Sequence, residues 1–116
     1  MSASHQIFIR ANRSLSDIVS DINKATGSSL TSTGKPEFPY AATLDSAFID
    51  IEPTHDYDSE PGLPFEEYST ILTVRDIDNN QKREEALSRG IFAKLATLPG
   101  YHVMLVFDLQ RNLMQS

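Results

Sequence analysis

The stretch Tyr101-His-Val-Met-Leu-Val-Phe-Asp-Leu109 is the most continuously apolar part of this 116-residue chain. Strands that are buried on both faces have such a composition, so the stretch predicts a fully covered β-strand. Directly before it, Pro99-Gly100 is expected to end a helix whose cap is formed by Asp78 and Gln81. The apolar residues that would share one face of this helix are Leu87, Ile91, Phe92, Leu95 and Leu98. Gly90 costs helix stability and is interpreted as a point of close packing on the sheet.

Three stretches further upstream have the residue pattern of strands. Residues 68–77 (YSTILTVRDI) are dense in β-branched and aromatic residues. Residues 47–52 (AFIDIE) alternate between two faces, one of which carries Asp50 and Glu52. Residues 6–11 (QIFIRA) have the same two-residue period and predict the first strand of the chain.

A capping box of Ser14 and Asp17 predicts a first helix, which Gly27 would close. Its apolar residues recur at helical spacing and are Leu15, Ile18, Val19, Ile22 and Ala25. Residues 28–39 are rich in Ser, Thr, Gly and Pro, and residues 54–64 combine prolines with carboxylates. Both of these stretches are predicted to be loops.

The predicted elements follow the order β-α-β-β-α-β within one domain that spans residues 1–116. This order indicates the α+β class, and its leading architecture is a ferredoxin-like two-layer sandwich. In that sandwich the last strand lies at an edge of the sheet, although here it is the most apolar strand. The strand order is therefore left open, and a partner that covers this edge is an alternative.

The negative charge of the chain is concentrated in its middle. Between Pro36 and Val74 there are nine carboxylates and neither lysine nor arginine, while the whole chain has a formal net charge of −6. Self-repulsion within such a block costs stability, so a compact protein that keeps one often presents it to a cationic partner. We expect that partner to be a protein. The acidic balance argues against binding to nucleic acid, whose phosphates would be repelled.

The sequence carries no cysteine, which excludes a disulfide framework, a thiolate metal site and a cysteine nucleophile. The N-terminal residues have neither the basic nor the apolar region of an export signal. The longest apolar run, residues 103–107, is too short to cross a bilayer. We therefore expect a soluble, cytoplasmic protein that does not bind membranes.

One stretch of the sequence has carboxylates at the spacing of a known metal site. Asp56, Asp58, Glu60 and Glu67 occupy the first, third, fifth and twelfth positions of a calcium-binding loop. Pro61 stands where such a loop requires glycine, so a solvated acidic loop is the favoured interpretation and calcium the alternative. The histidines lack the spacing of a zinc site, and we predict neither a metal nor a cofactor.

Catalytic signals are weak throughout the sequence. His55 beside Asp56 has the residue types of a general base and its orienting group, but no nucleophile is placed for it. An exposed loop histidine is the favoured interpretation. Paired carboxylates such as Glu66-Glu67 have the chemistry of a glycosidase, yet no sequence feature desolvates them. We therefore predict no catalytic residue and no enzyme.

Three segments carry a family resemblance: Asp56-Tyr-Asp-Ser-Glu-Pro-Gly-Leu-Pro-Phe-Glu-Glu-Tyr68, Ile71-Leu-Thr-Val-Arg75 and, after the second helix, Val103-Met-Leu-Val-Phe-Asp-Leu-Gln110. From Asp50 onward the chain resembles small bacterial immunity proteins, which neutralise toxins of the contact-dependent or polymorphic kind. The resemblance implies a cytoplasmic, non-catalytic inhibitor. Such an inhibitor binds a cognate toxin domain, commonly a nuclease with a basic substrate groove.

The acidic block offers a surface for such a partner, with Tyr57 as the expected anchor. The expected steering and pairing carboxylates are Asp56, Asp58, Glu60, Glu66 and Glu67, extended by Asp50 and Glu52 if their strand face is exposed. The alternative function is a small-ligand-binding or regulatory module, because βαββαβ domains commonly bind small molecules between strands and helices. A small hydrolase is the third class, and it would need a concave site with a raised carboxylate pKa. The sequence leaves the oligomeric state open.

Overall fold

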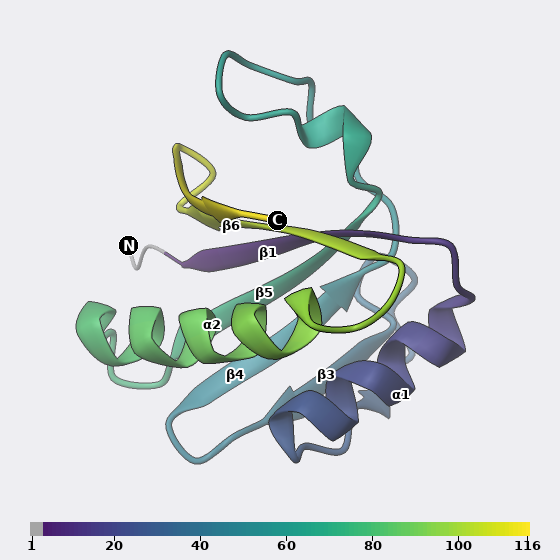
Figure 1. Cartoon of the computed structure of the whole chain (residues 1–116). Coiled ribbons are helices and arrows are strands. Elements are labelled where there is room, and N and C mark those ends of the chain that lie inside the picture. The colour runs from purple at the N-terminus through teal and green to yellow at the C-terminus, as the bar shows by residue number, and fades with distance from the viewer. Residues whose placement is uncertain (1–3) are drawn as a thin grey trace.

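An antiparallel sheet of seven strands forms the centre of the computed structural model, which describes residues 4–116. The strand order is β2-β3-β4-β5-β1-β6-β7. The strands are β1 (His5–Ala11), β2 (Thr31–Ser32), β3 (Tyr40–Thr43), β4 (Ala47–Glu52), β5 (Thr70–Asp76), β6 (Tyr101–Phe107) and β7 (Arg111–Gln115). Helices α1 (Leu15–Thr26) and α2 (Gln81–Ala96) lie together on one face of this sheet (Figure 1).

The first helix has the predicted ends. The Ser14 hydroxyl accepts a hydrogen bond from the Asp17 backbone N–H at 3.2 Å, which satisfies one of the free amides of the first turn. Gly27 adopts a left-handed conformation with φ of 70° and donates its N–H to the Asn23 carbonyl. The buried residues of α1 are Ile18, Val19 and Ile22. The prediction of this helix is therefore confirmed.

The second helix is present, but two details of its prediction are wrong. Its cap is Asn80, whose side chain accepts the Arg83 N–H at 3.1 Å. Asp78, the expected cap, instead lies in the turn before the helix, where its N–H donates to the Asp76 carboxylate. Gly90 is exposed, and a Cβ built on it would meet nothing within 4 Å, so it does not mark close packing. The expected apolar face is present, with Ile91, Phe92 and Leu95 buried and Leu87 and Leu98 packed partly against the core.

The sheet buries apolar side chains on both of its faces. The helix-covered face carries alternate residues such as Ile7, Leu72 and Leu105, which pack with α1 and α2. On the opposite face Phe8, Ile71, Met104 and Val106 pack with Leu63, Phe65 and Tyr68. The last three come from the connection between β4 and β5, which contains the short 3-10 helix η1 (Phe65–Glu67). This connection therefore covers part of the face of the sheet that the helices leave open.

The α+β class is confirmed, whereas the specific ferredoxin-like βαββαβ fold is not the fold observed. Three strands were not predicted: β2 and β3 extend the sheet beyond β4, and β7 extends it beyond β6. The strand β3 (YAAT) is short and alanine-rich, and β2 has two residues, so neither carries a strong strand pattern. The strand β7 covers the edge of β6, which explains why β6 is so apolar without a partner protein.

The β6–β7 connection is a tight turn that the sequence conceals. Asp108 and Leu109 both have positive φ, 51° and 58°, and Gln110 donates its N–H to the Phe107 carbonyl at 3.0 Å. This is the geometry of a type I′ hairpin, which usually contains Asn-Gly or Asp-Gly. Here the start of β1 holds the turn, because Asp108 and Leu109 donate their N–H groups to the Ser4 carbonyl and the Gln6 side chain.

A search of residues 4–116 for a helix long and apolar enough to span a membrane finds none.

Candidate functional site

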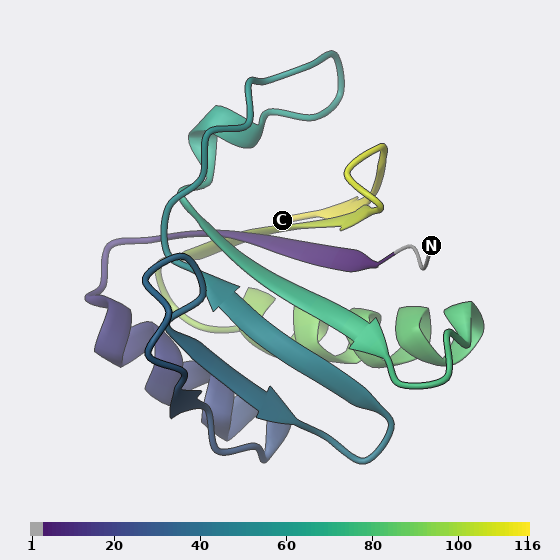
Figure 2. The same cartoon turned by 180° about the vertical axis from the view of Figure 1, so that it is seen from behind.

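The connection between β4 and β5 carries most of the predicted binding residues. It leaves the sheet at Pro53 and returns at Thr70. In Figures 1 and 2 it is the teal segment at the end of the molecule that lies away from both helices. Its buried residues Leu63, Phe65 and Tyr68 fasten it to the sheet, so that its polar residues are held at the surface.

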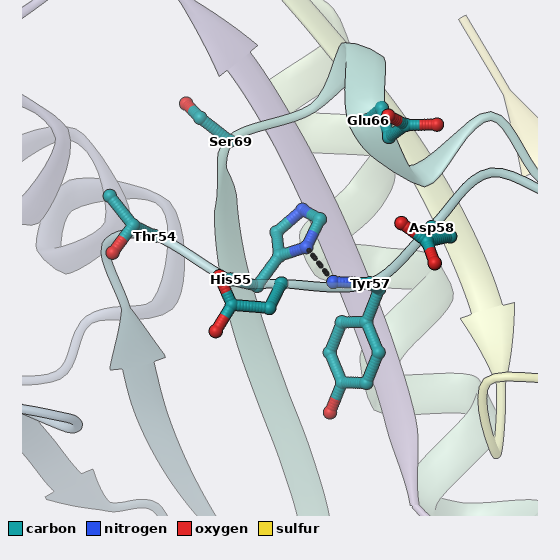
Figure 3. A pocket seen from close by; sticks show the side chains of 7 residues that line it. Thr54, His55, Tyr57, Asp58, Glu66 and Ser69 are labelled. Carbon is teal, nitrogen blue, oxygen red and sulfur yellow. Dashed lines mark hydrogen bonds between the residues drawn. The ribbon is translucent and has the colours of Figure 1, made fainter.

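His55 organises the first part of this connection. Its Nδ1 accepts a hydrogen bond from the Tyr57 N–H at 3.1 Å (Figure 3), and its Nε2 bonds the Tyr68 carbonyl. Because Nδ1 accepts, Nε2 must carry the ring hydrogen that the carbonyl receives. The ring also lies edge-on to Phe8, with centroids 5.4 Å apart. His55 is half-buried and structural, which corrects the interpretation as an exposed loop histidine.

A tight turn and a pair of reciprocal hydrogen bonds stabilise the rest of the connection. Glu60 and Leu63 exchange backbone hydrogen bonds of 2.9 and 2.8 Å around Pro61-Gly62, and Gly62 has the positive φ, 76°, that this turn requires. Ser59 and Glu66 are bonded reciprocally: the Ser59 N–H donates to the Glu66 carboxylate, and the Glu66 N–H donates to the Ser59 hydroxyl. The connection is thus braced by its own hydrogen bonds as well as by its buried residues.

This arrangement leaves a hollow of about 450 Å³ in the surface. Its lining consists of Thr54, His55, Asp56, Tyr57, Asp58, Glu66 and Ser69 (Figure 3). A second hollow of about 340 Å³ shares Thr54, His55 and Asp56 with the first and adds Glu37 and Glu52. We call the two adjoining hollows, with these lining residues, the acidic hollow. Tyr57 stands within it with 40% of its surface exposed.

The fold places five of the predicted binding residues in the acidic hollow and the other three outside it. Asp56, Tyr57, Asp58, Glu66 and Glu52 line the acidic hollow. Glu60 lies in the Pro61-Gly62 turn and does not line it. The carboxylate of Glu67 lies 3.7 Å from the Arg10 guanidinium, and Asp50 lies on the sheet, where it accepts a hydrogen bond of 3.0 Å from Arg75.

Burial sets the electrostatics on the sheet side of the acidic hollow. Burial raises the pKa of Glu52; the His55 imidazole opposes this shift, and the charges of Asp50 and Asp56 add to it. Burial likewise raises the pKa of the Tyr57 hydroxyl, and the charge of Glu52 contributes. The pKa of Asp50 is also raised by burial, although Arg75 offsets part of the effect. Within residues 4–116 its Oδ1 is buried without a hydrogen-bond partner.

The alternative of a calcium-binding loop finds no support in this geometry. Among residues 4–116 there is no group of three or more His, Cys, Asp or Glu side chains placed to hold a metal ion. Glu66 is engaged with Ser59, and Glu67 faces Arg10. The Glu60 and Leu63 backbone groups are bonded to each other across the Pro61-Gly62 turn, so the Leu63 carbonyl and the Glu60 carbonyl are already engaged.

Sequence reasoning missed part of the acidic hollow. Thr54 and Ser69 line it from the two ends of the connection, and Glu37 enters from the stretch before β3. Glu37 belongs to the same block of carboxylates, so its charge was visible. Its position was not visible, because the pairing of β3 with β4 is what brings residues 36–37 beside Pro53.

Comparison with known proteins finds no matching family model, no similar curated protein and no similar solved structure.

Proposed function

We propose that this chain is a non-catalytic inhibitor of the immunity type, which binds a basic domain of a partner protein through the acidic hollow. The observation that carries the proposal is Tyr57, a half-exposed aromatic side chain on a braced segment, which lines the same hollow as the acidic residues Asp56, Asp58 and Glu66. Aromatic anchors within a polar surround are the usual energetic centre of a protein interface.

The bracing of the segment supports binding. Ordering a loop on association costs free energy, and a loop that is already ordered avoids this cost. The His55 bonds to Tyr57 and Tyr68, and the reciprocal pair of Ser59 and Glu66, hold the segment in one shape. The carboxylates would accelerate the encounter with a positively charged partner, while Tyr57 would slow dissociation.

The acidic hollow also has one property of a hydrolase site, because the pKa of Glu52 is raised by burial inside a concave surface. A raised pKa suits a general acid, but the reaction also needs a base or a nucleophile. His55 is the nearest candidate base, and both of its ring nitrogens are engaged with the backbone. We therefore propose binding in preference to catalysis.

The kind of partner is proposed from the resemblance to immunity proteins. A toxin nuclease that acts on nucleic acid needs a basic groove for phosphates, and a carboxylate-lined surface is complementary to such a groove. Occupying the groove would exclude the substrate without any chemistry by the inhibitor. We propose that this neutralisation takes place in the cytoplasm of the bacterium that makes both proteins.

The test is capture of the partner from the native host, followed by kinetics with the purified partner. We expect Tyr57→Ala to raise the dissociation rate by about tenfold or more, as truncation of an interface anchor does. The double variant Asp56→Asn with Asp58→Asn should lower the association rate at low salt and flatten its salt dependence. Asp45→Asn, a change of charge in the exposed β3–β4 turn, is the matched control. Binding that is equal for all variants would overturn the proposal.

A further inference from the structure

A buried histidine and glutamate face each other far from the acidic hollow. His5, at the start of β1, is 1% exposed, and Glu84, in the first turns of α2, is 2% exposed. The His5 Nδ1 bonds the Glu84 Oε1, while the Glu84 Oε2 accepts the Asp76 backbone N–H at 2.9 Å. A carboxylate that receives the Nδ1 hydrogen fixes the orientation of the imidazole and leaves Nε2, itself buried, on the other side of the ring.

That second nitrogen has no hydrogen-bond partner among the residues from Ser4 to Ser116. Buried polar atoms are almost always paired, so an unpaired one at a surface hollow needs a reason. His5 lines a hollow of about 260 Å³ between α2 and the β6–β7 hairpin. The ring of Phe107 packs on the imidazole at 4.8 Å and closes the apolar side of this hollow.

Three of the four charged side chains that line this hollow besides His5 are cationic. Lys82 and Arg89 line it from α2, and Arg111 lines it from β7. Its one lining carboxylate, Glu85, is paired with Arg89 at 2.8 Å and stays 3.9 Å from the His5 Nε2, beyond hydrogen-bond distance. The Arg89 hydrogen bond holds the pKa of Glu85 below its usual range; burial opposes the shift, while His5 and Arg111 add to it. Neither Lys82 nor Arg111 has an ion-pair partner within residues 4–116.

We propose that this hollow, which we call the His5 hollow, binds a phosphate group. The His5 Nε2 takes up a proton and donates it in a hydrogen bond to a phosphate oxygen, and the buried Glu84 carboxylate balances the resulting imidazolium charge. Lys82 and Arg111 supply the remaining positive charge at the rim. The inference is independent of the proposed inhibitor function, because it uses none of the residues of the acidic hollow.

The charge of the hollow favours phosphate over the other small ligands. A metal cation would be repelled by Lys82 and Arg111, so His5 is not placed as a metal ligand. Two unpaired cations and an imidazolium match a phosphate, which carries nearly two charges at neutral pH, better than a carboxylate with one. The volume lies just below the range of drug-sized ligand sites, which suits inorganic phosphate or a small phosphate monoester.

The experiment follows the imidazole nitrogens of the full chain by long-range proton–nitrogen NMR correlation during titration with inorganic phosphate at constant ionic strength. We expect the His5 Nε2 signal to move saturably to the position of a protonated nitrogen, while exposed His102 does not saturate. A parallel titration with glycerol phosphate separates the two sources of the group. Tighter binding of the monoester assigns a phosphorylated small molecule, and weaker binding of the monoester assigns the free ion.

Substitutions at the rim test the site without disturbing the buried pair. Lys82→Gln with Arg111→Gln should weaken phosphate binding by about tenfold or more, because two positive charges that attract the phosphate are lost from the rim. Lys24→Gln with Lys94→Gln removes the same charge at a different surface, between α1 and α2, and should leave the affinity within about twofold. The proposal is overturned if no saturable shift occurs, if the control pair loses as much affinity, or if acetate binds as tightly as phosphate.

Discussion

Asp76 is the residue on which the largest number of hydrogen bonds around α2 converge. It lies at the end of β5, is almost fully buried, and accepts the N–H groups of Asp78 and Asn80 at 2.9 and 3.0 Å. Arg83 adds two hydrogen bonds, from Nε at 2.7 Å and from a terminal nitrogen at 2.8 Å. The Arg83 hydrogen bonds hold the pKa of Asp76 well below its usual range; burial opposes the shift, and the backbone N–H groups reinforce it.

Acid unfolding should therefore depend on Asp76. Because its pKa is lower in the folded protein than in the unfolded chain, its ionised form stabilises the fold above about pH 4, and this contribution is lost as the pH falls through the folded value. We expect Asp76→Asn to lower the free energy of unfolding at pH 7 and to flatten its decline below about pH 4. Urea denaturation across this pH range measures both effects. Asp78→Asn, an exposed neighbour that also contacts Arg83, should change little, and parallel curves for Asp76→Asn and the parent would contradict the account.

At the scale of elements, β7 decides which edge the sheet exposes. It is short and half exposed, yet it pairs with β6 in a register that shifts between Leu105 and Val106. Ser116 continues the pairing by donating its N–H to the Val103 carbonyl at 2.9 Å. The strand thereby blunts an edge whose residues 103–106 are fully buried, and a long apolar edge invites pairing with other chains.

Removal of residues 111–116 should therefore change the association state of the protein. The bare edge of β6 would offer its unpaired backbone groups to a second copy, so we expect dimers or larger species. Size-exclusion chromatography with light scattering, across a range of protein concentrations, measures this change. A full-length variant with Leu113→Ala keeps the backbone pairing and is the control. A truncated chain with the same mass distribution as the full chain would show that β7 does not protect the edge.

At the scale of the whole molecule, the two faces of the sheet are covered by different kinds of structure. Two helices cover one face, while the opposite face is covered over β1, β5 and β6 by the connection between β4 and β5. The ring of Phe65 stacks on that of Phe8 with centroids 4.8 Å apart, and it is 3% exposed. The connection that carries the acidic hollow is therefore fastened to the sheet by a buried hydrophobic cluster.

The connection should consequently unfold together with the sheet. We expect Phe65→Ala to lower the free energy of unfolding by about 3 to 5 kcal/mol, the usual cost of emptying a buried aromatic site. Tyr57→Ala, an exposed aromatic change on the same connection, is the control and should cost much less. Urea denaturation gives both values, and hydrogen exchange shows whether the connection opens with the strands. A small loss for Phe65→Ala would mean that the connection is a separate flap.

The charge and much of the binding surface were readable from the sequence, but their arrangement was not. Tyr57 and its flanking carboxylates were singled out from composition, and they do line the acidic hollow. Glu67 has the same chemistry as Glu66, yet it turns to Arg10, because successive residues of the 3-10 helix point in different directions. Glu37 joined the site through strand pairing, which no local pattern reports.

The sequence by itself determined the elements whose signals are local. A cap at Ser14, a left-handed Gly27, the two-residue periods of β1 and β4 and the strand-forming composition of β5 and β6 act within a few residues. For this reason α1, these four strands and the apolar face of α2 could be predicted. Only the tertiary structure decided the β6–β7 turn, where Leu109 takes a positive φ because Gln6 captures its N–H. It also decided the pairing of His5 with Glu84 across 79 positions. Both depend on hydrogen bonds between segments that meet only after the sheet has formed, and their free energy has no counterpart in the local sequence.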